Sequence, residues 1–214
     1  LVTKSHYRFH LTIENIGQSI LTPDQFHFNI RSPEALTLTV GPLDKTSPFH
    51  HSDITLTVDT LEQTGPFEIG LQMMRGDKPV GGEIVQQVEI VPPPNVFIKA
   101  KMWFKQMTSC DDFTFLVYEN GDLKKKVEGV SIENGTGEIA ELRDVVPGQE
   151  YRFVLLKPFY LPQQVFAYLK EKDTTVEFPR LLPFDFNNDG AATVEDITEV
   201  LMQSPFGVLS KLLF

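Results

Sequence analysis

The stretch DFTFLVYENGDLKKKVEGVSIENGTGEI, residues 112–139, decides the fold class of this 214-residue chain. It contains two Asn-Gly pairs, Asn120-Gly121 and Asn134-Gly135, and apolar residues recur at alternate positions beside them. Both residues of such a pair adopt positive φ readily, so Asn-Gly between alternating segments is the strongest short signal of a β-hairpin. The stretch therefore predicts three consecutive antiparallel strands joined by two tight turns.

Similar alternation continues on both sides of this stretch. Successive side chains of a strand point to opposite faces of a sheet, so a period of two predicts a strand with one buried face. Gly- and Pro-rich turns separate the segments at a spacing typical of a two-sheet sandwich. The expected strands lie near residues 7–13, 26–30, 36–40, 54–58, 67–73 and 83–91, and then near 95–104, 137–145, 149–156, 163–170 and 174–181.

The clearest break in the chain is VPPPN at residues 91–95. Three consecutive prolines cannot donate to a sheet ladder and favour an extended connector. We therefore predict an Ig-like β-sandwich at 1–91, a proline linker at 92–94 and a second β-sandwich at 95–181. The remaining segment, 182–214, carries a different pattern. The predicted fold class is mainly β, with two tandem antiparallel sandwiches followed by a short calcium loop and a helix.

Composition excludes several classes of partner. The chain has 41% hydrophobic residues and 17 Phe, which is ample for a core, and a formal net charge of −10. With no basic block, such a charge disfavours nucleic acid and anionic lipid as partners.

The single cysteine, Cys110, cannot form an internal disulfide, and we expect a buried, unreactive thiol. No stretch approaches the ~20 apolar residues of a membrane span. Without an initiator Met and with a strand-like start, the sequence is expected to be a piece of a longer chain.

The segment 185–196, DFNNDGAATVED, has the spacing of a calcium-binding loop. Ca²⁺ prefers six to eight hard oxygen ligands, and a loop of this kind supplies them from positions 1, 3, 5, 7, 9 and 12, with glycine at position 6 for the sharp turn. Gly190 holds that position. The predicted ligands are Asp185, Asn187, Asp189, Ala191 through its carbonyl, Thr193 and Asp196. Thr193 is also the expected N-cap of a following helix. The alternative is a polar, Asx-rich turn without metal.

The stretch DFNNDGAATVEDITEVL, residues 185–201, is similar to one repeat of a type I dockerin, which reads D-x-N-x-D-G-x5-D followed by a helix. Pro183 disfavours a helix entering the loop, which fits such a half-hand better than a complete EF-hand. A complete dockerin has two loops, and its paired helices recognise a cohesin. Only one loop of this pattern occurs in the sequence. The resemblance implies calcium binding, and a cohesin-type scaffold partner follows only as an alternative.

Two further stretches resemble parts of known sandwich domains. LRDVVPGQEYRFVLLKPFYLPQQ, residues 142–164, resembles the Pro-Gly-x-Tyr stretch of carboxypeptidase-regulatory-like, or prealbumin-like, domains. The matching residues are Leu142, Pro147, Gly148 and Tyr151. HLTIENIGQSI, residues 10–20, resembles the N-x-G strand and turn of bacterial surface repeats. Both resemblances imply non-catalytic β-sandwich modules of secreted or surface proteins.

Candidates for other chemistry are few. Core packing is the favoured interpretation of Trp103, Phe97, Phe104 and Tyr118, and a sugar-stacking face formed by these aromatic residues is the alternative. Ser204 and Pro205 could begin a second C-terminal helix. The histidines lack metal-ligand spacing, and no nucleotide-binding or nucleophile-elbow motif occurs. We therefore predict no catalytic residues and no enzymatic activity.

These observations predict a non-catalytic, calcium-binding structural or adhesion module of an extracellular or cell-surface bacterial protein. In this interpretation Ca²⁺ orders the C-terminal segment. Two alternatives remain: a carbohydrate-binding module of a secreted glycosidase that uses Trp103, or a dockerin-like anchoring module that binds a cohesin-type partner. A polysaccharide, or a cell-surface or scaffold protein, is accordingly the expected partner class.

Overall fold

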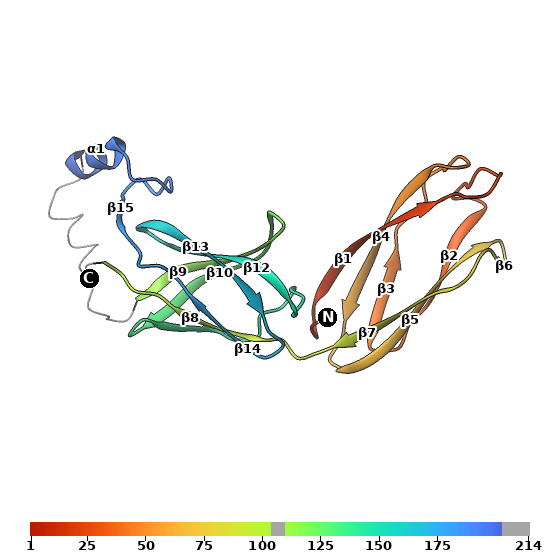
Figure 1. The fold of residues 1–214 in the computed structure, drawn as a ribbon, viewed down its shortest axis with the longest axis horizontal. Helices are drawn as coiled ribbons and strands as arrows, with labels where there is room; N and C mark the ends of the chain where they lie inside the picture. Colours follow the sequence, from red (N-terminus) through yellow and green to blue (C-terminus); the bar gives the residue numbers. More distant parts are fainter. Residues whose placement is uncertain (104–109, 203–214) are drawn as a thin grey trace. The chain divides into compact units, whose positions relative to one another are not determined.

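The computed structural model describes residues 1–103 and 110–202. Within these residues the chain forms fifteen strands and a single helix, so the predicted mainly β fold is confirmed (Figure 1). The chain divides into two compact units, Leu1–Pro92 and Pro93–Phe214, and the division falls inside the proline run. No helix in the described part of the chain is long and apolar enough to cross a membrane. The second helix expected after Ser204 lies outside the described residues.

The first unit is a sandwich of two antiparallel sheets. Its strands are β1 (His6–Glu14), β2 (Phe26–Arg31), β3 (Leu36–Val40), β4 (His51–Thr60), β5 (Gly65–Arg75), β6 (Lys78–Pro79) and β7 (Ile84–Ile90). One sheet has the order β1-β4-β3, and in the other β5 pairs with β2, β6 and β7. An immunoglobulin constant domain has the orders A-B-E-D and C-F-G. Strands β1, β4 and β3 correspond to B, E and D, and β2, β5 and β7 to C, F and G. The strand order is therefore Ig-like.

The N-x-G stretch holds the turn that follows β1. Asn15 is buried, and its side-chain nitrogen donates to the carbonyls of Ser19 (2.8 Å) and Thr46 (3.1 Å). Its side-chain oxygen accepts the Gly17 N–H at 3.1 Å. An Asx side chain that bonds the backbone two residues on is a recurrent turn device. The asparagine thus satisfies three backbone groups where the chain leaves the first sheet.

The second unit is built on one continuous sheet. Its strands are β8 (Asn95–Lys99), β9 (Cys110–Glu119), β10 (Asp122–Glu133), β11 (Thr136–Ile139), β12 (Gln149–Lys157), β13 (Phe159–Leu169), β14 (Asp173–Glu177) and β15 (Pro183–Asp185). The strand order is β14-β8-β11-β10-β9-β12-β13-β15. The pair β14–β8 is parallel, which corrects the prediction of wholly antiparallel sandwiches. The sheet also continues to Asp185, beyond the expected end of the domain at residue 181.

A single buried cluster takes side chains from every strand between β8 and β14. A sheet that buries both of its ends in one core must fold over on itself, which produces a sandwich-like packing. The long strand β10 joins the two halves, because it pairs with β9 and with β11. Both Asn-Gly turns beside it have positive φ at both residues, as expected: Asn120 (50°) and Gly121 (94°), and Asn134 (50°) and Gly135 (83°). The two hairpins predicted from the sequence are confirmed.

The Pro-Gly-x-Tyr stretch forms a corner before β12. The Tyr151 hydroxyl accepts the Val146 N–H at 2.8 Å and lies 3.1 Å from the Val146 carbonyl, to which it donates. Gly148 adopts φ +93°, a conformation that favours glycine. Burial raises the pKa of Tyr151, so the hydroxyl keeps its proton and its bond to the carbonyl. The motif therefore has a structural role.

Candidate metal centre

The predicted calcium loop lies between β15 and helix α1 (Val194–Met202) (Figure 1). Strand β15 pairs with β13, with Asp185 opposite Phe159 and Pro183 opposite Tyr160. Next in the chain, Phe186 packs against the core cluster, and its ring centroid lies 6.5 Å from that of Phe159. A strand enters the loop, in agreement with the expectation that Pro183 disfavours an entering helix. The first end of the loop is thus fixed to the second unit.

The loop backbone turns at two residues with positive φ, Asn188 (58°) and Gly190 (88°). The Asn188 side-chain oxygen accepts the Phe159 N–H at 2.9 Å, which ties the loop to the turn between β12 and β13. Sequence reasoning missed this contact, because Asn188 occupies an unconstrained position of the calcium-loop pattern. A Cβ on Gly190 would lie 3.7 Å from Pro162, an ordinary contact, so φ alone explains the glycine.

Asp185 is the unusual group of the loop. It is only 3% exposed, and its Oδ2 accepts the Gly190 N–H at 3.1 Å. Its Oδ1 is buried and has no hydrogen-bond partner. Burial raises the pKa of this carboxyl, and the neighbouring Asp189 and Asp196 charges add to the rise. Asp185 also lines a cavity of about 450 Å³ between the loop and the β12–β13 hairpin. A carboxylate oxygen is therefore desolvated without compensation.

Asp196 closes the loop from the first turn of α1. Its Oδ2 accepts the Thr193 N–H at 2.7 Å, while its Oδ1 accepts the N–H groups of Phe186 (2.7 Å) and Asn187 (3.3 Å). Thr193 Oγ1 in turn accepts the Glu195 N–H at 3.2 Å, so Thr193 is the N-cap of α1 and Asp196 bonds back to its N–H. These hydrogen bonds, that of Thr193 first, lower the pKa of Asp196. The carboxylate joins both ends of the loop.

The other predicted ligands lie on the exposed side of the loop. Asn187 Oδ1 accepts the Asp189 N–H at 3.0 Å, and Asn187 Nδ2 donates to Asp189 Oδ2 at 2.9 Å. Asp189 Oδ1 accepts the Ala191 N–H at 2.9 Å. These are local Asx-type bonds. Exposed side chains held by such bonds rotate at low cost compared with the buried pair, Asp185 and Asp196.

The loop contains all six predicted ligands but does not draw their carboxylates together. Over residues 1–103 and 110–202, no three His, Cys, Asp or Glu side chains are grouped as a metal site requires. The hydrogen bonds described above are those of a polar turn that precedes a helix. Coordination of a cation at Asp185 Oδ1 requires Asn187 and Asp189 to turn inward from their present bonds.

A second candidate site surrounds Trp103, whose side chain is 52% exposed. Core packing is therefore the wrong interpretation of this residue. The Arg180 guanidinium lies 5.6 Å from the centroid of its ring, and Arg180 lines a cavity of about 470 Å³. The Lys99–Glu177 ion pair (2.6 Å) lines the same cavity. The Arg180 guanidinium, a hydrogen-bond donor, thus lies beside the exposed indole at one side of this cavity. Phe104 lies outside the described residues.

No protein-family model matches the sequence, and no curated protein sequence matches it. Among solved structures, domains D2 and D3 of the major pilin SpaD from Corynebacterium diphtheriae are 11% identical with a TM-score of 0.28, over 83% of this chain and 93% of that one. Domains 4–9 of the surface layer protein SbsC are 13% identical with a TM-score of 0.30, over 82% and 30%. Full-length SpaD is 9% identical with a TM-score of 0.28, over 85% and 64%. At these values the likeness does not extend to function.

Proposed function

We propose that the loop 185–196 binds Ca²⁺ and that the chain is a non-catalytic structural module of an extracellular or cell-surface protein. The observation that carries the proposal is the buried, unpartnered Oδ1 of Asp185. A buried polar atom without a partner costs free energy, and a charged one costs more. A cation bound at this oxygen would remove that cost.

The rest of the loop supplies oxygens at suitable spacing. Asp185 is held by β15, while the exposed Asn187 and Asp189 side chains can turn toward its free oxygen. The Ala191 carbonyl and the Thr193 hydroxyl complete the set, and Asp196 ligates or keeps the loop closed. A flexible, oxygen-rich loop suits Ca²⁺ better than Mg²⁺, which demands near-ideal octahedral geometry. Zinc is disfavoured, because the loop contains neither His nor Cys.

A bound Ca²⁺ would couple the edge of the second sheet to α1. In this role the ion orders the C-terminal segment and performs no reaction. Modules with weak calcium sites, with Kd values on the order of 10⁻⁴–10⁻³ M, are characteristic of extracellular proteins. An extracellular location, together with two sandwich-like units in tandem, supports a structural or adhesive role at a cell surface.

Calorimetric titration of Ca²⁺ into the EDTA-stripped 214-residue chain tests the proposal. We expect one site, with a Kd of roughly 10⁻⁵–10⁻³ M. Asp189→Asn should weaken binding at least about tenfold, because it removes a ligand charge from an exposed side chain without disturbing the core. Asp122→Asn, at an exposed position of β10, is the matched control and should bind as the parent does. Absence of a calcium-dependent heat, or equal affinities for the three proteins, would contradict the proposal.

The exposed Trp103 favours a second candidate function, carbohydrate binding. Aromatic faces beside hydrogen-bonding groups are typical of small polar ligand sites. If this function holds, a polysaccharide pull-down should retain the full chain, and Trp103→Ala should reduce retention at least about tenfold. Phe166→Ala, which removes a 61% exposed ring elsewhere in the same unit, should leave retention unchanged. Equal retention of the two variants would exclude a role for Trp103.

A further inference from the structure

The segment that joins β5 to β7 in the first unit carries the tripeptide Arg75-Gly76-Asp77. Arg75 ends β5 and pairs with Lys78 at the start of β6, so Gly76 and Asp77 form the two-residue turn of a tight hairpin. Gly76 has a φ of 55°, and a glycine with positive φ at the first central position is typical of a type II′ hairpin turn. The strands on both sides therefore fix the shape of the tripeptide.

This hairpin lies at one end of the first unit (Figure 1). Strands β5 and β7 correspond to F and G of an immunoglobulin domain, so the tripeptide occupies the position of the F–G loop. In variable domains this loop is one of the three that recognise antigen. A Cβ on Gly76 would meet no atom within 4 Å in the described part of the chain, apart from its chain neighbours. The tip of the hairpin is thus open to a partner.

Both charged groups of the tripeptide are exposed, and in the described part of the chain neither takes part in an ion pair or a side-chain hydrogen bond. They have opposite charges and are two residues apart, yet they do not pair with each other. Elsewhere in the same sheet, Arg31 pairs with Glu68 at 2.8 Å and with Glu83 at 3.0 Å. Opposite charges within reach therefore pair in this sheet, whereas the turn keeps Arg75 and Asp77 available for separate contacts.

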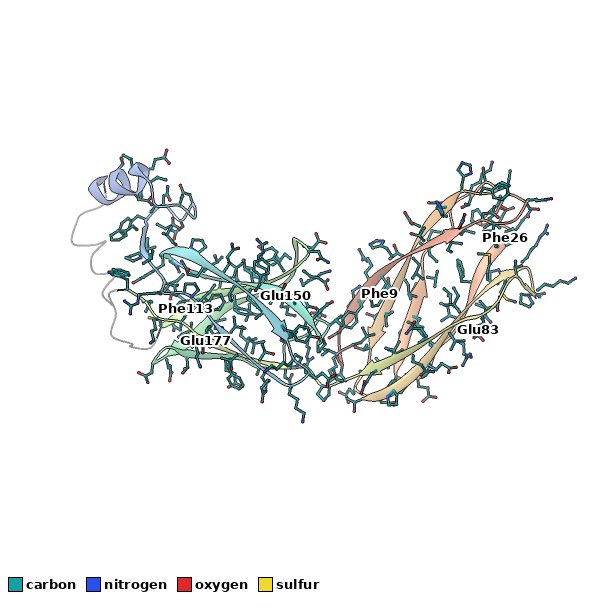
Figure 2. All side chains as sticks on the ribbon, viewed as in Figure 1. Phe9, Phe26, Glu83, Phe113, Glu150 and Glu177 are labelled. Atoms are coloured by element: carbon teal, nitrogen blue, oxygen red, sulfur yellow. The ribbon has the colours of Figure 1, made fainter. Side chains whose placement is uncertain are left out.

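The Arg75 side chain rests on an aromatic ring. Phe26, labelled in Figure 2, lies opposite Arg75 on the neighbouring strand β2, and its ring centroid is 5.7 Å from the guanidinium carbon. The Phe26 side chain is only 6% exposed, so the ring is a fixed support for the longer arginine side chain. A cation–π contact at an exposed site is weak. The contact therefore restricts the guanidinium before binding, which reduces the entropy lost on binding, and gives way to a partner at low cost.

We propose that Arg75-Gly76-Asp77 binds a receptor that offers a divalent cation to the Asp77 carboxylate and an acidic pocket to the Arg75 guanidinium. A free carboxylate is the kind of hard oxygen ligand that such a cation takes. Arginine forms paired hydrogen bonds with carboxylates, and the intervening glycine lets the receptor approach the backbone closely. Integrins recognise Arg-Gly-Asp sequences by these two contacts. The proposal rests on the extracellular location proposed above, and it does not depend on calcium at the loop 185–196.

Surface plasmon resonance tests the proposal with the full chain and two immobilised receptors, the integrin ectodomains that bind fibronectin and vitronectin, in a buffer that contains manganese. At least one receptor should bind the parent chain saturably, and EDTA or the free peptide Gly-Arg-Gly-Asp-Ser should abolish this binding. Asp77→Glu should weaken binding at least about tenfold, because it keeps the charge but displaces the carboxylate from the cation. Arg75→Ala should weaken binding by at least about the same factor, because it leaves the acidic pocket unpaired.

The second unit provides a matched control. The hairpin between β9 and β10 has the sequence Asn120-Gly121-Asp122, so it presents a Gly-Asp pair without the arginine. Asp122→Glu should therefore bind the receptor as the parent does. Asp185→Asn, which alters the calcium loop, should also bind as the parent does, and this variant separates the hairpin from the metal site. Circular dichroism checks that every variant is folded.

Failure of both receptors to bind the parent chain would overturn the proposal. Equal binding of Asp77→Glu and the parent would also overturn it, because attraction between charges alone does not distinguish aspartate from glutamate. If Asp122→Glu or Asp185→Asn lost as much affinity as Asp77→Glu, the contact would lie elsewhere in the chain and the proposal would be wrong.

Discussion

Replacement of Phe153 by alanine is expected to lower the free energy of unfolding of the second unit by about 3–5 kcal/mol. Phe153 is fully buried in the centre of β12, and its ring stacks on that of Phe115, with 5.5 Å between centroids. Tyr151 packs against it at 6.2 Å. Truncation removes the buried ring and leaves a cavity that rigid strands on both sides cannot close.

Urea denaturation followed by tryptophan fluorescence measures this loss. The chain has one tryptophan, Trp103, and it lies in the second unit, so the signal reports on that unit. Phe166→Ala is the matched control, because the Phe166 ring is 61% exposed on the adjacent strand β13. Its cost should be within about 0.5 kcal/mol of zero. Similar losses for the two variants would contradict the core assigned to the second unit.

Local patterns predicted the elements that local physics determines. The Asn-Gly turns at 120–121 and 134–135 carry their conformational preference within two residues, so the hairpins on both sides of β10 followed from sequence alone. The N-cap role of Thr193 was equally local, because it depends only on the residues that follow it.

Pairings between distant segments could not be predicted in the same way. Strand β14 pairs in parallel with β8, which lies almost eighty residues earlier, and alternation within either strand does not indicate its partner or direction. Strand β15 is short and begins with Pro183, so neither length nor propensity marks it as a strand. Alternation in β1 predicted which side chains face inward, yet it carries no information on how closely the opposite sheet approaches them.

In the candidate site, too, the local features could be predicted from the sequence and the tertiary contacts could not. Spacing placed six oxygen-bearing residues in one loop, and the structure places them there. The spacing could not show that the Asp196 carboxylate accepts hydrogen bonds from the N–H groups of Thr193, Phe186 and Asn187. Nor could it show that one oxygen of Asp185 is buried without a partner, because that depends on β15 pairing with β13. Whether a loop of this spacing holds metal depends on such tertiary contacts.

Calcium is expected to raise the melting temperature of the parent chain's second unit, and Asp185→Asn should abolish the response. At free calcium about 100-fold above Kd, binding to the folded form alone adds about 2.7 kcal/mol. For a unit of this size the gain corresponds to a rise of roughly 8 °C. In EDTA, Asp185→Asn should melt no lower than the parent, because the variant removes a buried charge whose Oδ1 has no hydrogen-bond partner. If Asp185 had only a structural role, its replacement by asparagine would instead lower the melting temperature in EDTA.

The pH dependence of the melting temperature further distinguishes the calcium-free protein from the calcium-bound protein. Because the pKa of Asp185 is raised in the folded protein, its charged form opposes folding, and this penalty is relieved as pH falls toward the raised pKa. Without calcium, the difference in melting temperature between variant and parent should therefore shrink between neutral pH and an acidic pH near the raised pKa of Asp185. With calcium the parent should instead lose its advantage over the same interval, since protons compete with the cation for the carboxylate. The pKa of Asp196 is lowered, so that group stays charged and its contribution to stability is constant throughout.

Differential scanning fluorimetry at both pH values, with EDTA or calcium, measures all four cases. A parent that melts identically with and without calcium, and an Asp185→Asn variant that melts well below it in EDTA, would show that Asp185 merely holds the turn.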